Sequence, residues 1–200
     1  MDPALRNIQL AFGRTLGEKP AIGMVEFNSI AGGIATADAM LKRAPVDLLE
    51  CRPVCPGKFI VLVGGMTDPV NEAMAAADER GTEAVVDRLL LPNVHPSIFP
   101  AIVGAVEVQE VESLGIIETI SVASTIVAAD ASAKAADVTL TEMRLANGLG
   151  GKSFYLMVGT LHDVEAATEA GLEMVRSAGL LVRYELIQQL HDGVRQKVMF

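Results

Sequence analysis

Residues 21–54 read AIGMVEFNSIAGGIATADAMLKRAPVDLLECRPV, and residues 113–146 read SLGIIETISVASTIVAADASAKAADVTLTEMRLA. The two stretches match at one offset of about 92 residues, which is the signature of an internal repeat. The matched pairs include Gly23/Gly115, Glu26/Glu118, Asp38/Asp130 and Lys42/Lys134. The match resumes after a short insertion, at Gly57/Gly151 and Lys58/Lys152. The sequence therefore predicts two tandem domains, at 21–104 and 113–200, after an N-terminal extension at 1–20.

Each copy carries the same order of secondary-structure signals. In the first copy, Ser29 is placed to cap a helix that Pro45 ends. Alternating and β-branched apolar residues predict strands on both sides of the turn at residues 55–58. The expected elements are strands at 22–27, 46–53, 59–63 and 85–91, and helices at 30–44, 68–80 and 95–102. The order βαββαβ predicts an α+β fold built from two tandem ferredoxin-like domains.

Composition excludes several classes of function. The 200 residues carry 16 Lys plus Arg and 25 Asp plus Glu, a formal net charge of −9. Such a chain lacks the clustered cations that bind nucleic acid or anionic membranes. We find no apolar run long enough to span a bilayer and no basic leader typical of a signal peptide. The two cysteines are too few to staple a fold of this size, so a reducing cytosol is expected.

A glycine-rich segment at Ala146–Ser153 approximates a phosphate-binding P-loop. A P-loop needs a helix directly after it, so that backbone N–H groups point at the phosphate. The residues from Phe154 onward are instead typical of a strand. A tight glycine-rich turn is therefore favoured over nucleotide binding.

Cys55 is the more informative residue, because it lies in a Pro/Gly turn between two strands. A buried structural thiol remains one interpretation. The other Cys, Cys51, lies about 13 Å away along an extended strand, too far for a disulfide, and packing is its expected role. One Cys cannot hold a metal alone, but three copies around a threefold axis would supply three thiolates.

Other catalytic chemistry is not indicated. The three His residues lack metal-ligand spacing, and no Ser/His/Asp set stands out. Glu26 and Glu118 are interpreted as polar residues at the end of an edge strand. We expect the protein not to be an enzyme.

The repeated stretch from Ala21 resembles the start of the bacterial microcompartment (BMC) shell domain, and the resemblance recurs from Leu114. Two unpermuted copies resemble the tandem-domain, trimer-forming class (BMC-T). The segments 54–59, 91–102 and 145–154 are similar to the type found in propanediol-utilisation shells. The resemblance implies a pseudo-hexameric homotrimer that tiles edge to edge with other shell proteins, in the shell of a compartment in the bacterial cytoplasm.

In this family the turns between the second and third strands surround a central pore. The residues matched to these pore loops are Val54, Pro56, Gly57, Lys58, Asn147, Gly148, Leu149, Gly150, Gly151 and Lys152. The resemblance assigns to Cys55 the role of ligand to one [4Fe–4S] cluster per trimer, an oxygen-sensitive group that aerobic purification can remove. Electron transfer or redox sensing across the shell follows from it, with redox enzymes on either side as further partners.

The family also places a lysine of the first helix at the rim of the disc, where discs meet. Lys42 and Lys134 match it, and Asp38 and Asp130 stand four residues earlier, so each lysine also has an ordinary helical ion pair. His95 and Pro96 match the rim region after the fourth strand. The alternative function is a purely structural tile with a metabolite pore and no cluster, and a ferredoxin-like enzyme or regulator is a third.

Overall fold

The computed structural model describes residues 20–81, 84–104, 106, 108 and 111–198. The expected extension at 1–20 lies outside this range, apart from Pro20, which begins the first strand. The described chain divides into two compact units, one ending at Val94 and the other beginning at His95. Among the described residues, no helix is long and apolar enough to cross a membrane.

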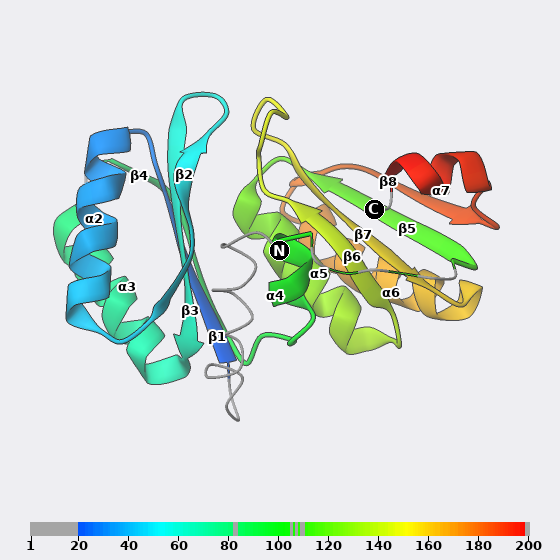
Figure 1. The fold of residues 1–200 in the computed structure, drawn as a ribbon, viewed down its shortest axis with the longest axis horizontal. Helices are drawn as coiled ribbons and strands as arrows, with labels where there is room; N and C mark the ends of the chain where they lie inside the picture. The colour runs from blue at the N-terminus through cyan, green and yellow to red at the C-terminus, as the bar shows by residue number, and fades with distance from the viewer. Residues whose placement is uncertain (1–19, 82–83, 105, 107, 109–110, 199–200) are drawn as a thin grey trace. The chain divides into compact units, whose positions relative to one another are not determined.

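The first unit has the predicted βαββαβ order. Its elements are β1 (Pro20–Phe27), α2 (Ile30–Arg43), β2 (Asp47–Val54), β3 (Lys58–Met66), α3 (Thr67–Gly81) and β4 (Val85–Pro92). The strands form one antiparallel sheet in the order β2-β3-β1-β4, with α2 and α3 on the same face of it (Figure 1). This is the ferredoxin-like topology that the sequence predicts.

The second unit repeats the architecture. Its elements are α4 (Ile98–Ile102), β5 (Ser113–Thr119), α5 (Val122–Ala135), β6 (Thr139–Arg144), β7 (Ser153–Gly159), α6 (Leu161–Arg176), β8 (Leu181–Gln188) and α7 (Asp192–Val198). The sheet order is β6-β7-β5-β8, the same arrangement as in the first unit. The internal repeat of the sequence is therefore a repeat of structure.

Local signals act as the sequence predicts. Ser29 Oγ accepts the backbone N–H of Gly32 at 3.1 Å, and Ser121 Oγ accepts that of Ser124 at 3.2 Å. Each serine supplies an acceptor to the first turn of a helix, where backbone donors lack intrahelical partners. The helix α2 ends at Arg43, just before Pro45.

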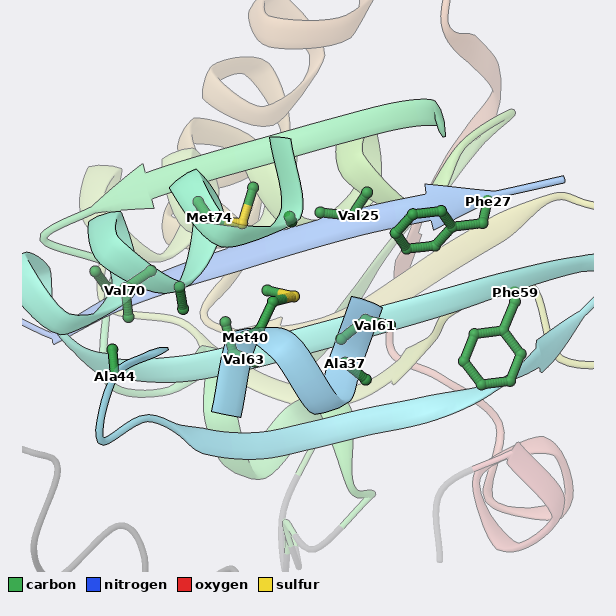
Figure 2. Packing of buried hydrophobic residues seen from close by; sticks show 13 residues of the cluster. Val25, Phe27, Ala37, Met40, Ala44, Phe59, Val61, Val63, Val70 and Met74 are labelled. Carbon is green, nitrogen blue, oxygen red and sulfur yellow. The ribbon is translucent and has the colours of Figure 1, made fainter. Parts of the chain in front are cut away.

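The core of the first unit lies between its sheet and its two helices. Figure 2 shows Met40 of α2 and Met74 of α3 meeting Val25 and Val61 of the central strands. All four side chains are buried. Methionine fills irregular gaps, which suits a core with few aromatic residues.

The core of the second unit is built differently at the same positions. Tyr155, fully buried, takes the place of Val61, and Ser132 takes the place of Met40. Ser132 Oγ donates to the carbonyl of Ala167 at 2.7 Å and accepts from the Tyr155 hydroxyl at 2.7 Å. Burial raises the pKa of Tyr155, so this hydroxyl stays protonated as the donor.

The helix α4 belongs to the first repeat in sequence but to the second unit in space. It packs against β6, the edge strand of the second sheet, and contacts α5. Its buried residues are Ile98, Phe99, Ala101 and Ile102. The sequence repeat and the compact unit therefore have different boundaries over residues 95–104.

Candidate functional site

Two turns at corresponding positions are the candidate site. In the first unit, Cys55, Pro56 and Gly57 connect β2 to β3; the Cys55–Pro56 peptide bond is cis, and Gly57 has φ 77°. In the second unit, the turn between β6 and β7 is longer and runs through Gly148, with φ 71°, to Lys152. Left-handed backbone of this kind favours glycine.

The second turn does not have P-loop geometry. Ser153 begins the strand β7 directly after it, and no helix N-terminus follows. The prediction of a strand here is confirmed, and the turn lacks the helix dipole that a P-loop directs at phosphate.

An ion pair stands at the base of each turn, and sequence reasoning missed both. Lys58 Nζ lies 3.1 Å from Glu26 Oε1, and Lys152 Nζ lies 3.1 Å from Glu118 Oε2. The Glu26 side chain is 5% exposed and the Glu118 side chain 34%. The signal that could have found them is the repetition of both partners in both copies.

The interpretation of Glu26 and Glu118 as edge-strand residues is wrong. They lie on β1 and β5, which are inner strands, each paired on both sides. The register shift of β1 against β4 falls at Glu26/Phe27, and that of β5 against β8 at Glu118/Thr119. Each glutamate thus lies where the ladder is irregular, and each pairs with the lysine that follows the glycines of the neighbouring turn.

Both cysteines are free thiols. Cys55 is half-buried in the turn, and Cys51 is exposed on β2. Partial burial, and then the negative charge of Glu50, raise the pKa of Cys51. The expected packing role of Cys51 is therefore wrong within one chain, because β2 is an edge strand that leaves this side chain uncovered.

Within the described part of one chain, no group of three or more His, Cys, Asp or Glu could hold a metal ion. Within that part of the chain, Cys55 is therefore not a member of such a group. The donor itself suits iron–sulfur chemistry, since such clusters are held by Cys thiolates. The second turn offers Asn147 rather than a thiol.

Comparison with known proteins identifies the repeated domain. The sequence model of the BMC domain matches residues 21–94 and 113–190. The chain belongs to the BMC-domain family of bacterial microcompartment shell proteins. As such it is a structural protein of that shell, and the resemblance drawn from the sequence is confirmed.

Individual relatives agree over nearly the whole length of this BMC protein. It is 40% identical to the bacterial microcompartment shell protein PduT of Citrobacter freundii, over 90% of this chain and 97% of the relative. A crystal structure of a microcompartment protein from Desulfitobacterium hafniense DCB is 46% identical, with a TM-score of 0.85 over 88% of this chain and 98% of the other. The fused permuted hexameric shell protein MSM0275 from the RMM microcompartment shares the fold, with a TM-score of 0.58 and 23% identity, over 86% of this chain and 92% of the other.

The lysines that the family resemblance assigns to a rim form helical ion pairs. Lys42 Nζ lies 2.6 Å from Asp38 Oδ2, and Lys134 Nζ lies 2.6 Å from Asp130 Oδ2. The Asp38 side chain is 60% exposed, whereas that of Asp130 is 7% exposed. The pairing predicted from the i, i+4 spacing is confirmed, and the two copies of it differ sharply in environment.

His95 joins this group in the second unit. Its backbone N–H donates to Asp130 Oδ1 at 2.7 Å, and its ring Nδ1 lies 2.7 Å from Ser97 Oγ. The structure therefore brings His95, Asp130 and Lys134 together, while Pro96 is exposed beside them. The bond from His95 to Asp130 comes from the main-chain N–H, while the ring contacts Ser97.

Proposed function

We propose that the protein is a homotrimeric shell tile of the PduT type, whose three Cys55 thiolates hold one [4Fe–4S] cluster at a central pore. The proposal rests on one observation: a free, half-buried thiol in the turn between β2 and β3, in a chain 40% identical to PduT. The site needs a rotation axis, because each chain offers a single thiol there.

The turn suits a shared site because Cys55 is partly open to its surroundings rather than sealed in a core. Asn147 at the matching place in the second turn adds no thiolate, which limits the ligand set to three.

When bound, a cluster of this kind supplies one-electron transfer, and three thiolates leave one iron open to a ligand from outside the protein. Around it, the chain's own residues fix the position of the donor. Gly57 and Pro56 shape the turn, and the Lys58–Glu26 pair ties the start of β3 to the inner strand β1.

The remaining parts of the proposal concern assembly. The turns at 54–58 and 147–152 line the pore, and Lys42 and Lys134 lie at the rim, where tiles meet edge to edge. Redox enzymes on the two sides of the shell are the partners that such a cluster would serve.

The test is anaerobic purification with iron and sulfide analysis. We expect a brown protein with close to four iron atoms per three chains, and loss of iron and colour in Cys55→Ser. The matched control is Cys51→Ser, which removes the only other thiol of the chain and should keep both. A colourless trimer that contains no iron contradicts the cluster and leaves a purely structural tile.

A further inference from the structure

Asn147 and Gly148 form a dipeptide in which the asparagine side chain reacts readily with the backbone of the next residue. Both residues are exposed in the turn between β6 and β7. They follow Leu145 and Ala146, which are 2% and 1% exposed. The reactive pair is therefore the first part of this turn that solvent reaches.

The backbone nitrogen of Gly148 is accessible as a nucleophile. Gly148 has φ 71°, and a Cβ there would meet no atom within 4 Å apart from its chain neighbours. Within the part of the chain that the structure describes, its N–H donates no hydrogen bond. By contrast, the N–H of Lys152 in the same turn donates to the carbonyl of Leu149 at 3.2 Å. Neither a side chain nor a hydrogen bond thus hinders attack by the Gly148 nitrogen.

Asn93 provides a comparison within the same chain. It also has a left-handed backbone, with φ 54°, and it is exposed just after β4. The next residue, Val94, is buried and donates its N–H to the carbonyl of Pro20 at 2.9 Å. A nitrogen that carries a branched residue and is held in a hydrogen bond is a poor nucleophile, so Asn93 is expected to be stable.

The two remaining asparagines of the described chain also lack the combination found at Asn147. Asn28 is exposed, but Ser29 follows it, and the serine side chain hinders the approach that glycine leaves open. Asn71 lies inside α3, where the next backbone N–H is held in a helical hydrogen bond. The structure therefore ranks Asn147 first in reactivity, Asn28 second, and Asn71 and Asn93 last.

We propose that Asn147 is a site of spontaneous deamidation, which converts the side-chain amide of the second turn to a carboxylate. The Gly148 nitrogen loses its proton to water and attacks Cγ of Asn147. The new N–Cγ bond closes a cyclic succinimide, the Cγ–Nδ2 bond breaks, and the nitrogen leaves as ammonia after taking up a proton. Water then opens the ring at either carbonyl, which gives aspartate or isoaspartate. The sum consumes water and releases ammonia, with no oxidation or reduction.

Each such event adds one negative charge to the second turn, and isoaspartate also routes the backbone through the side-chain carbon. The reaction itself needs only the folded chain. Its effect on the assembly rests on the proposed function, because a trimer would carry three of these turns. Such a tile would age through species that differ by one charge each.

The test is incubation of the purified full-length protein at physiological temperature and mildly alkaline pH, followed by peptide mapping by mass spectrometry. We expect Asn147 to deamidate about tenfold faster than Asn28, because glycine leaves its nitrogen unhindered. Deamidation at Asn71 and Asn93 should be slower again, and isoaspartate should be part of the product at position 147. The rate should rise with pH, since the deprotonated nitrogen is the nucleophile.

The matched control is Asn147→Gln. It keeps the amide but lengthens the side chain by one methylene group, so ring closure is disfavoured and position 147 should stay unmodified. Equal rates at Asn147 and Asn28 in the parent protein would overturn the inference.

Incubation in guanidinium chloride separates the effect of the fold from that of the sequence. The turn leaves the Gly148 nitrogen accessible, so the rate at Asn147 in the native protein should stay within about tenfold of the rate in the unfolded chain. A native rate below that limit overturns the inference, because the fold then protects the pair.

The outcomes are distinguishable from those of the proposed function. Native anion-exchange chromatography of the aged protein should resolve species with up to three added charges per particle. A single added charge, with Asn147 deamidated, overturns the homotrimer and leaves the modification site standing. A trimer in which Asn147 stays intact overturns the inference and leaves the proposed tile standing.

Discussion

The two repeats share a fold and differ in what their surfaces meet. Asp130 is buried and accepts the backbone of the segment that enters α4, whereas Asp38 is exposed. Leu140 is fully buried on β6, whereas Leu48 is exposed on β2. The difference comes from α4, which packs on the second repeat and has no counterpart on the described part of the first. The second repeat therefore shows how this domain buries its edge strand when a terminal helix covers it.

The largest loss of stability is expected in the second repeat, where the charged side chain of Asp130 is buried. Asp130→Ala removes the acceptor of the His95 N–H and the partner of Lys134, and should lower the free energy of unfolding by about 2–3 kcal/mol. Asp38→Ala removes only an exposed i, i+4 pair and should cost within about 0.5 kcal/mol. Both are measured by urea unfolding of the purified protein. Equal losses of stability in Asp130→Ala and Asp38→Ala would contradict the difference drawn between the two repeats.

The cores of the repeats provide a second contrast. A Cβ at Gly171 would clash with the Tyr155 hydroxyl and would lie 2.5 Å from Ser132 Oγ. The matching residue of the first repeat is Ala77, which is buried without a tyrosine opposite it. Gly171→Ala should therefore destabilise by about 1–2 kcal/mol, despite the better helix propensity of alanine.

A double variant sharpens this contrast. Tyr155→Phe removes the clashing hydroxyl, so Gly171→Ala should cost less in that background than in the parent, as a thermodynamic cycle measures. Strictly additive costs in urea unfolding would show that the tyrosine is not what excludes the methyl group.

The smallest difference is expected at the two turn lysines. Glu26 is nearly buried under Lys58, and Glu118 is partly solvated beside Lys152. Glu26→Gln weakens a charge-assisted contact shielded from water and should cost about 1 kcal/mol. Glu118→Gln should stay within about 0.5 kcal/mol, because solvent screens its pair. Both variants are measured by thermal unfolding. A larger loss of stability in Glu118→Gln than in Glu26→Gln would contradict the view that burial strengthens the Glu26–Lys58 pair.

Much of this was accessible from the sequence. The repeat, the βαββαβ order, the serine caps and the i, i+4 ion pairs all depend on residues close in sequence, and all are confirmed. The helix α4 continues the first repeat in the sequence, yet it packs on β6 within the second unit, a long-range contact that local patterns do not encode. The strand order that puts Glu26 in the interior depends on long-range pairing, which periodicity does not encode.

The candidate site was only partly predictable for a similar reason. The sequence predicts the turn that holds Cys55, and Lys58 and Lys152 are among the residues that the resemblance matches to the two turns. Their ion pairs with Glu26 and Glu118 join residues on neighbouring strands, so spacing alone did not reveal them. Cys51 is exposed in the single chain. A pattern of apolar residues indicates which side chains are buried, but it does not say whether the same chain or a second one covers them.

The most direct test of the shared thiol site is native mass spectrometry of the anaerobically purified protein. The account predicts a trimer that carries the added mass of one [4Fe–4S] cluster, and a Cys55→Ser trimer without it. A cluster bound to a single chain, or one retained by Cys55→Ser, would contradict the claim that three copies build one site.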